Sequence, residues 1–596
     1  MDNHDHVRKL TWFINGLVVL MFFIISSTVS AQSLPGAATP GGIDPARKGV
    51  MIPEAKKLPD VYIPPINDRP LDVDEGVQIL VNDFVISGLN DLEHSSQAFK
   101  DIWEAITSYK RLPATYTIGQ LQLLADNITK YLRGQGHILA HAFIPEQTVE
   151  SGIINIRILV GKLGIVTSED NDKYSDRVLN RIFKPLLDKP VNQKDIESAM
   201  LYVMKYPGLD VTGVFSKGEE VGETKLTLKV QDEKPFEFSL STDNYGSEYT
   251  GLYRVRLDAS LNNPVKLGDQ LNLTVLQGLD PEETTYGAFN YKVPLPNFHY
   301  TVGIGGEFST YGVVKEFKTL GIDGEVWKAN AFVERSFINQ KDLGLSAVLD
   351  FSRKQSKSTQ NNSQFDTEDG LSVGSFAINA DCMDYVFEKI GIGGGISTMG
   401  LTYSHGFGDF LDSMDRKNAT KSSRLGGSGE YAGGEFDKVN LALNRLQYIG
   451  KGLSCLMRFE GQWSEDLMVS LEQFSLSGPD RVRAYEPAEL MRDKAWFGSV
   501  EFMLNSSAFY DEVAFNNYSW AEILQLSVFF DYADGRLNDP LGNEVEDALY
   551  GAGVGLRFSI PGRFLFNISA ATPLGSYTPS DGKDDCQIYF SSTLYF

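Results

Sequence analysis

The sequence predicts two small α+β domains followed by an all-β transmembrane barrel of 16 antiparallel strands. Three observations support this. Between residues 76 and 232, apolar stripes at helical spacing alternate with strand-like runs, twice in the order β-α-α-β-β. From residue 236 onward, short segments alternate apolar and polar residues. After residue 31 no apolar run is long enough for a membrane helix, so a barrel remains the way to pair every backbone group in lipid.

The first 31 residues have the layout of a secretory signal peptide. Arg8 and Lys9 precede an apolar run from Leu17 to Ile25, and small residues follow it. We expect cleavage after Ala31. A single membrane anchor is the alternative, but the run is short for a spanning helix.

Residues 32–75 form a proline-rich linker. Eight prolines fall in this stretch, at positions 35, 40, 45, 53, 59, 64, 65 and 70, and they predict an extended chain. Asp44 and Pro45 are suitable as the cap and first residue of a short helix, which Pro53 would end.

Residues 76–161 predict the first α+β domain. A strand at 83–88 is followed by two helices and by strands at 138–144 and 153–160. Thr117 and Gln120 form a capping-box pattern at the start of the second helix. The apolar stripes of the two helices are Phe99, Ile102, Trp103, Ile106 and Tyr109, and Leu121, Leu124, Ala125, Ile128 and Leu132.

His137 and His141 do not predict a metal site. They fall on a strand, and no carboxylate lies between them as in zinc proteases.

Residues 162–232 repeat the pattern and predict a second domain. Its helices are expected near 175–187 and 192–206, and its closing strands at 209–215 and 224–230.

Residues 233–596 predict the barrel. Eleven strands are expected near 236–244, 249–261, 270–278, 286–293, 300–310, 322–337, 343–354, 371–384, 393–406, 437–449 and 453–465, and five more near 496–505, 519–533, 547–559, 563–571 and 586–596. The even number suits a bacterial barrel. The strand count also places the polar stretches 355–370 and 407–436 on the same side of the membrane as the root of the loop around Arg483, because consecutive strands run in opposite directions. A soluble β-sandwich is the alternative, which the signal peptide and the terminal Phe596 disfavour.

The polar loop from Ser477 to Pro487 has Val482, Arg483, Ala484 and Tyr485 at its centre. A predicted strand some fifty residues later alternates between two faces. Leu524, Leu526, Val528, Phe530 and Tyr532 suit lipid, and Gln525, Ser527, Phe529 and Asp531 suit a watery lumen. We therefore expect Asp531 to point into the barrel, within reach of Arg483, with Phe529 under the Arg483 side chain.

Composition restricts the function. The net charge of −24, from 78 acidic and 54 basic residues, argues against nucleic acid as a partner. The three cysteines, Cys382, Cys455 and Cys586, form no metal motif and no disulfide framework. No catalytic triad order, nucleophile elbow or phosphate loop is present, so we expect no catalytic residue, cofactor or metal. An outer-membrane enzyme stays the alternative class.

The Val482–Tyr485 loop and the Phe529–Asp531 strand resemble the Val-Arg-Gly-Tyr and Phe-x-Asp motifs of the two-partner secretion (TpsB-type) outer-membrane transporters of the haemolysin secretion/activation family. Ala484 stands where that family usually has Gly. Residues 131–147 are similar to the signature of the family's first POTRA domain, with His137 in place of an aromatic residue. The ending at Phe596 resembles the signal read by the outer-membrane assembly machinery.

The resemblance covers the mature chain and implies a function. It implies two periplasmic POTRA domains and a barrel in the outer membrane of a Gram-negative bacterium, with a short helix that plugs the barrel. The expected partners are one large secreted (TpsA-like) protein, membrane lipid and the barrel-assembly machinery, and the expected state is a monomer. A barrel-assembly insertase, which usually carries more POTRA domains, and a passive porin, which needs none, are the alternatives.

Overall fold

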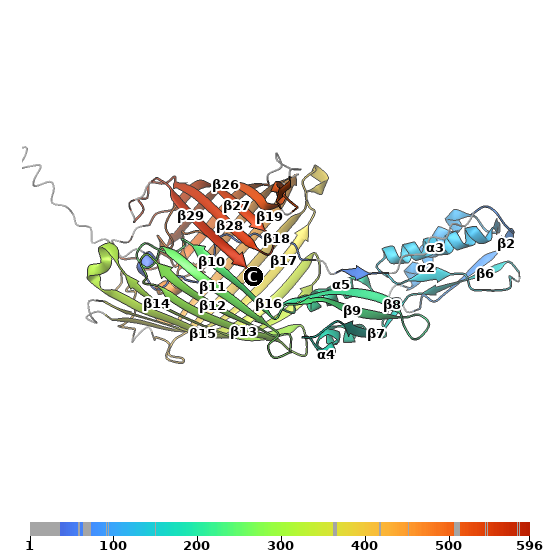
Figure 1. Ribbon diagram of the computed structural model, residues 1–596, viewed down its shortest axis with the longest axis horizontal. Helices are drawn as coiled ribbons and strands as arrows, with labels where there is room; N and C mark the ends of the chain where they lie inside the picture. The colour runs from blue at the N-terminus through green and yellow to red at the C-terminus, as the bar shows by residue number, and fades with distance from the viewer. Residues whose placement is uncertain are drawn as a thin grey trace, which may run out of the picture.

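Two small domains lie in a row beyond one mouth of a β-barrel in the structure, a computed structural model (Figure 1). It describes residues 36–57, 60–63, 73–90, 92, 95–149, 151–360, 366–415, 419–450, 452–505, 513–515, 517–542, 544, 546–580, 582 and 585–596. The expected signal peptide lies outside these residues. None of the helices described is long and apolar enough to cross a membrane.

The first domain packs two helices on a three-stranded sheet. Its elements are β2 (Ile79–Val81), β3 (Asp83–Ser87), α2 (Ser95–Tyr109), β4 (Ala114–Tyr116), α3 (Ile118–Gly134), β5 (His141–Phe143) and β6 (Ile153–Leu159), and the sheet order is β3-β6-β5. The predicted capping box starts α3, because the Gln120 backbone N–H donates to Thr117 Oγ1 at 3.0 Å. Ile102, Trp103 and Ile106 of α2, the predicted stripe of α3 and the inner face of β6 form one core. Phe99 and Tyr109, at the two ends of the stripe predicted for α2, are exposed instead.

The second domain repeats this arrangement. Its elements are β7 (Lys162–Glu169), α4 (Asp176–Asn180), η2 (Arg181–Leu186), α5 (Gln193–Val203), β8 (Leu209–Lys217) and β9 (Glu223–Glu233). The helix expected at 175–187 changes to a 3-10 turn at Arg181, where Pro185 cannot donate a backbone hydrogen bond. A short linker strand, β1 (Val61–Tyr62), joins the sheet, whose order is β1-β8-β9-β7. The sequence did not predict this strand.

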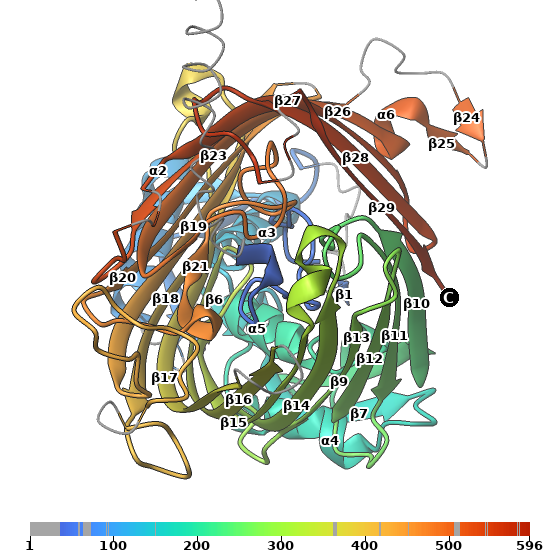
Figure 2. The same ribbon diagram turned by 90° about the vertical axis from the view of Figure 1, so that its left-hand side faces the viewer.

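The predicted 16-stranded barrel is confirmed: the strands form one closed antiparallel sheet, β10 to β20, β23 and β26 to β29. They are β10 (Phe236–Asp243), β11 (Tyr253–Asn262), β12 (Gln270–Leu279), β13 (Thr285–Pro294), β14 (Tyr300–Val313), β15 (Ile322–Asn339), β16 (Leu343–Thr359), β17 (Thr367–Asp384), β18 (Gly395–Phe407), β19 (Phe436–Gly450), β20 (Leu453–Ser464), β23 (Lys494–Asn505), β26 (Leu524–Arg536), β27 (Leu549–Ile560), β28 (Phe564–Pro573) and β29 (Gln587–Tyr595). β29 pairs with β10 and closes the ring (Figure 2).

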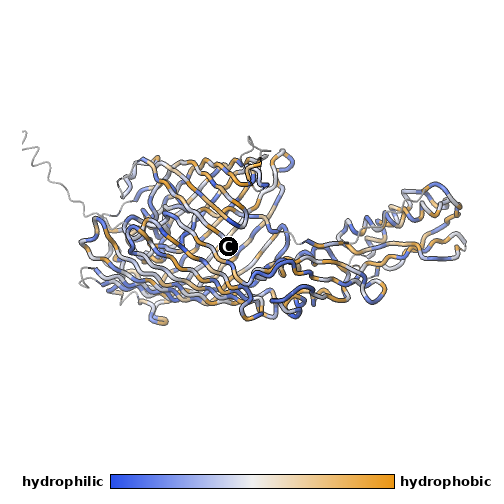
Figure 3. Tube along the Cα trace, in the orientation of Figure 1, coloured by the Kyte–Doolittle hydropathy of each residue, from blue (hydrophilic) through white to orange (hydrophobic). Residues whose placement is uncertain are grey.

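Hydrophobic and hydrophilic residues alternate along the barrel strands, as the alternating orange and blue of the Cα trace in Figure 3 shows. On β26, Leu526, Val528 and Phe530 are exposed on the outer surface, whereas Phe529 and Asp531 are buried on the inner one. The outer face therefore suits lipid and the inner face suits water.

Two expectations about the barrel are wrong in detail. The stretch 355–370, expected as an outside loop, is mostly strand, because β16 continues to Thr359 and β17 begins at Thr367. The strand expected from residue 519 begins only at Leu524. Before it, the Ser519 N–H donates to the Glu522 carboxylate at 2.8 Å, and this local cap favours the short helix α6 (Trp520–Ile523) over strand.

The second domain contacts the short turns at the near mouth of the barrel. Tyr202 of α5 stacks edge-on against Phe298, with ring centroids 4.9 Å apart, and its hydroxyl lies 3.0 Å from His299 Nδ1. Arg181 donates to the Leu267 carbonyl at 3.5 Å. These turns share one end of the barrel, and the longer connections, such as residues 419–435 and 465–493, share the other.

Candidate functional site

The barrel lumen holds a segment of the chain's own N-terminal region, residues 36–57. At the far end Ala37 and Ala38 are buried against Tyr249, Tyr311 and Phe317. At the near end Lys56 Nζ donates to the Gln340 carbonyl at 3.0 Å and pairs with Asp381 at 2.8 Å. The segment therefore runs through the barrel from the far mouth to the domains.

The helix considered after Asp44 and Pro45 does not form. The Asp44 carboxylate accepts from the Ala46 N–H at 3.0 Å, and the Arg47 N–H donates to the Asp44 carbonyl, so the chain makes an isolated turn. Wall contacts compete with helical bonds here, since Arg254 donates to the Arg47 carbonyl at 3.0 Å. Within residues 36–57, all of them described, the one helical turn is η1 (Gly36–Ala38), drawn in dark blue inside the barrel in Figure 2.

This lumenal segment packs closely on the loop between β20 and β23, residues 465–493. The Gly41 N–H donates to Ser470 Oγ at 3.2 Å. A Cβ on Gly41 would lie 1.9 Å from the Ser470 carbonyl oxygen, and one on Gly36 would lie 2.2 Å from that of Ala488. Only glycine fits at these two close approaches.

The loop folds back into the lumen and is braced by its own hydrogen bonds. Two short strands in it, β21 (Phe474–Ser475) and β22 (Met491–Arg492), pair with each other. Ser477 Oγ donates to the Glu486 carbonyl at 2.7 Å and accepts from the Glu489 N–H at 2.9 Å. The loop tip is thus a compact unit rather than a flexible arc.

At this tip Arg483 meets Asp531 on β26. Arg483 Nε and Nη2 donate to the two Asp531 oxygens at 2.8 and 2.9 Å, a bidentate fork. The Arg483 backbone N–H also donates to Asp531, at 3.2 Å. The Arg483 guanidinium carbon lies 3.3 Å from the centre of the Phe529 ring, where the sequence analysis expected it. Side-chain exposure is 4% for Arg483 and 1% for Asp531, so the pair is sealed from water.

Two further residues belong to this cluster, and the sequence did not predict them as site residues. Arg483 Nη1 donates to Glu501 at 2.7 Å, and Ser499 Oγ donates to Asp531 at 2.7 Å. Ser499 and Glu501 both lie on the inner face of β23, which pairs with β26. Strand alternation in the sequence predicts their inward direction, but it does not show that β23 is the neighbour of β26.

The residues around Arg483 are buried against the wall. Val482, Ala484 and Tyr485 belong to one apolar cluster with Phe497 and Phe529. The Tyr589 hydroxyl donates to the Tyr485 carbonyl at 2.7 Å. The methyl group of Ala484 fits because the residue that faces it is Gly551. A Cβ added to Gly551 would lie 2.4 Å from the Cβ of Ala484. This pairing accommodates Ala484 where the resembled motif has Gly.

A second charged anchor holds the root of the loop. Glu472 pairs with Lys354 of β16 at 2.6 Å and with Lys438 of β19 at 2.8 Å, and it is buried. Burial by itself raises the pKa of this loop carboxyl, but the two ammonium groups outweigh burial and lower that pKa to about 2. The loop is therefore tied to both sides of the lumen.

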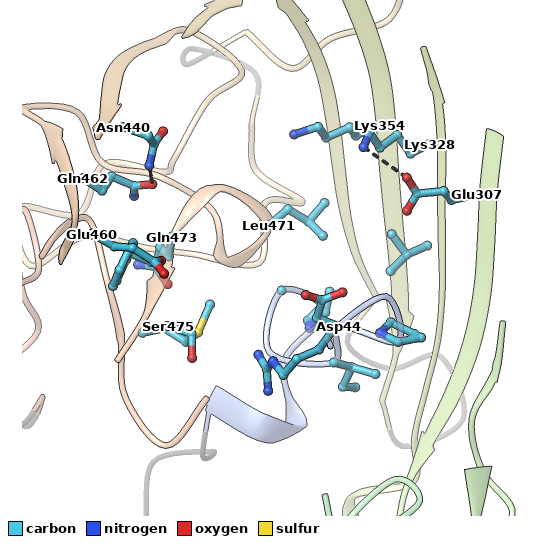
Figure 4. A pocket seen from close by; sticks show the side chains of 18 of the residues that line it. Asp44, Glu307, Lys328, Lys354, Asn440, Glu460, Gln462, Leu471, Gln473 and Ser475 are labelled. Carbon is cyan, nitrogen blue, oxygen red and sulfur yellow. Dashed lines mark hydrogen bonds and ion pairs between the residues drawn. The ribbon is translucent and has the colours of Figure 1, made fainter. Parts of the chain in front are cut away.

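A polar cavity of about 620 Å³ remains between the lumenal segment, the loop and the wall (Figure 4). Asp44, Gln473 and the wall pair Lys328–Glu307, 3.1 Å apart, border it. Such a space suits water rather than a hydrophobic ligand. In the described part of the chain no three His, Cys, Asp or Glu side chains are placed to hold a metal ion.

Comparisons with known proteins agree on one family. The family described as haemolysin secretion/activation protein ShlB/FhaC/HecB matches residues 222–558, more than half of the chain, and the ShlB-type POTRA domain matches residues 92–161. The heme/hemopexin transporter protein HuxB of Haemophilus influenzae (strain 86-028NP) is 22% identical over 487 residues, which cover 80% of this chain and 81% of HuxB.

Solved structures show the same fold. CdiB from Escherichia coli has a TM-score of 0.64 at 19% identity, covering 89% of this chain and 93% of CdiB. CdiB from Acinetobacter baumannii has a TM-score of 0.57 at 19% identity, covering 91% and 95%.

Proposed function

The chain belongs to the haemolysin secretion/activation protein family ShlB/FhaC/HecB, and from this we infer that its closed barrel is the resting state of an outer-membrane transporter of two-partner secretion. It recognises a secreted partner protein through its two POTRA domains and exports it through the barrel. The observation that carries this is the placement of both POTRA domains at one mouth of a 16-stranded barrel.

The orientation follows from the family. The barrel lies in the outer membrane, and the POTRA domains are in the periplasm. The near mouth, with the turns that contact α5, then faces the periplasm, and the loop 465–493 enters the lumen from the cell-surface side. An unfolded partner chain meets the POTRA sheets first, and their edges are suited to pair with an extended segment.

Export requires the lumen to open. Residues 36–57 and the loop 465–493 both occupy the path of the partner chain. We propose that the Arg483–Asp531 pair and the Glu472 anchor hold the loop in the closed position, and that the partner shifts the loop and the lumenal segment together because they are packed on each other. A closed lumen argues against a passive porin, which conducts solutes through an open channel. We propose no catalytic role for the site.

Further partners follow from the outer surface. Membrane lipid covers the apolar outer face of the strands. We propose that the barrel-assembly machinery binds at β29, next to which Phe596 is exposed and stacks on Phe238 with ring centroids 4.8 Å apart. We propose a monomer, because the sheet closes on itself and leaves no barrel strand unpaired among those described.

Deletion and complementation in the native host test this function. The proteins of the culture medium and cell surface are compared between the parent and a strain lacking this chain. One large protein should disappear on deletion and return with the intact chain, but not with a variant lacking residues 76–232. If no secreted or surface protein depends on the chain, the assignment is wrong.

A further inference from the structure

An arginine on the lipid-facing side of the barrel has no charged partner in the described part of the chain. Arg335 lies near the periplasmic end of β15, between Val333 and Phe337 on the same outer face, and all three side chains are exposed. No described residue accepts a hydrogen bond from Arg335 or forms an ion pair with it. A charged group on this face is unfavourable in lipid unless an opposite charge reaches it.

Two aromatic rings hold the Arg335 side chain. Its guanidinium carbon lies 5.3 Å from the ring centre of Tyr300, which is opposite Arg335 on β14, and 4.7 Å from that of Phe337. The pairing of β15 with β16 shifts between Ser336 and Ile338, so Phe337 is the extra residue of a β-bulge, which re-aims side chains next to it. Ring contacts use the face of a guanidinium, so its five N–H donors stay available for an acceptor.

A second arginine shows the same problem solved within the protein. Arg445 of β19 lies opposite Met457, also on the outer face and near the periplasmic end. Its Nη1 and Nη2 donate to the two Asp384 oxygens at 2.8 and 3.0 Å, and its guanidinium carbon lies 5.6 Å from the Phe387 ring centre. The charge of Arg445 is therefore neutralised by a carboxylate of this chain, whereas Arg335 has the ring contacts without a carboxylate among the described residues.

The residues next to Arg335 and Tyr300 hold the second POTRA domain. Ser336, which follows Arg335, accepts a hydrogen bond from the Tyr202 hydroxyl of α5 at 3.2 Å. His299, which precedes Tyr300, has its Nδ1 3.0 Å from the same hydroxyl. The Ser336 N–H also donates to the His299 carbonyl at 2.8 Å. The arginine on the outer face is thus one residue away from the contact that docks the domain on the other face.

We propose that Arg335 binds the phosphate of a phospholipid in the periplasmic leaflet, and that this lipid stabilises the docked position of the second POTRA domain. A phosphodiester accepts two parallel bonds from a guanidinium, which an ammonium group cannot offer. The acyl chains cover Val333 and Leu349, which are opposite each other and exposed on the outer face. The proposal rests on the place of the barrel in the outer membrane and not on the transport of a partner.

Native mass spectrometry of the full-length protein tests the phosphate site. Delipidated protein in a non-ionic detergent is titrated with palmitoyl-oleoyl phosphatidylglycerol, or with the diacylglycerol of the same chains, which lacks the phosphate. The parent should retain the phospholipid and not the diacylglycerol. Arg335→Gln should bind the phospholipid about tenfold more weakly. Asp384→Asn/Arg445→Gln is the matched control, since it removes an outer-face arginine together with its carboxylate, and it should bind like the parent.

Inorganic phosphate separates a lipid site from a site for free anions. A large excess of it should not displace the phospholipid, because the buried acyl chains contribute to binding. Displacement by inorganic phosphate refutes the lipid as the ligand. An equal loss of phospholipid in Arg335→Gln and in the control, or equal retention of the diacylglycerol, shows nonspecific boundary lipid only and refutes the site.

Thermodynamic linkage tests the connection to the domain. If the bound lipid favours docking, then loss of docking weakens lipid binding by the same factor. Tyr202→Ala removes the hydroxyl contacts and the ring packed on Phe298, and it should lower the affinity for phosphatidylglycerol about threefold or more in the same assay. Lys194→Ala, at an exposed position of the same helix, is the control and should not change it.

A milder variant covers the case that Tyr202→Ala disturbs the domain. Tyr202→Phe removes only the hydroxyl that contacts Ser336 and His299, and it should also weaken lipid binding. Lipid affinities equal to the parent in both Tyr202 variants refute the connection to the domain.

Discussion

Arg483 and Asp531 lie 48 residues apart in the sequence, yet their side chains form a two-point ion pair inside the barrel. The pair joins the tip of the lumenal loop to the wall at β26. An exposed ion pair contributes about 0–1 kcal/mol, too little to fix a long loop. Removing one partner of a buried pair costs about 3–5 kcal/mol, because the other charge stays buried and unpaired.

We predict that Arg483→Ala and Asp531→Ala each leave the barrel assembled and reduce export about tenfold or more. Arg483→Lys should also fail, since an ammonium group cannot form the bidentate fork. Export is measured for both single variants and the double variant, and barrel insertion is checked by heat-modifiable migration. Arg481→Ala is the matched control, because Arg481 lies on the same loop and its pair with Glu460 of β20 is only partly buried. If the two losses add in the double variant, the residues act independently and the lock is wrong.

Glu501 should have a smaller effect than Asp531. It accepts one bond from Arg483, whereas Asp531 accepts three. Glu501→Gln keeps an acceptor at this position. We therefore expect the loss of export in this variant to be smaller than the loss in Asp531→Ala, measured in the same assay. An effect as large as that of Asp531→Ala would show that Glu501 is the main acceptor of the loop.

Gly41→Val should open the pore. Its side chain would meet the Ser470 carbonyl and push the lumenal segment off the loop. The expected result is a higher single-channel conductance in planar bilayers, or longer open times. Gly287→Val on β13 is the control, because no atom lies within 4 Å of a Cβ there. An unchanged conductance would mean that the segment does not limit the pore.

Glu472→Gln should loosen the root of the loop. The substitution leaves Lys354 and Lys438 without their shared carboxylate. We expect faster protease cleavage within residues 465–493 in the intact barrel, while Glu465→Gln, which changes an exposed pair with Lys494, leaves the cleavage rate unchanged.

The same anchor has a defined pH dependence. The folded-state pKa of Glu472 is depressed to about 2, so the stabilisation is present above its ordinary pKa and is lost as the pH falls through about 2. Cleavage of the parent protein should therefore not change between pH 7 and 5, and a large rise over that range would argue against the anchor.

The mature protein should begin at Gln32. The basic residues, apolar run and small residues before it predict signal cleavage after Ala31. N-terminal sequencing of protein purified from outer membranes checks this, and an intact Met1 would contradict it.

The sequence by itself determined what repeats locally. Side chains alternate every two residues along a strand, so the inward direction of Phe529 and Asp531 followed from their neighbours on β26. The capping box at Thr117 marked the start of α3 for the same reason, since all of its bonds lie within one helical turn. The resemblance then supplied the partner of Asp531, which alternation could not name.

Only the tertiary structure decided which segments meet inside the lumen. Gly41 and Ser470 are 429 residues apart, and no local pattern in either one points to the other. Glu472 became an anchor because β16 and β19 bring Lys354 and Lys438 to the same place, and β1 became a strand because β8 offered it a free edge. These contacts depend on closure of the whole barrel and on the docking of two domains. The free energy of these contacts comes from pairs of segments far apart in the sequence, and neither segment by itself predicts which other segment it will contact.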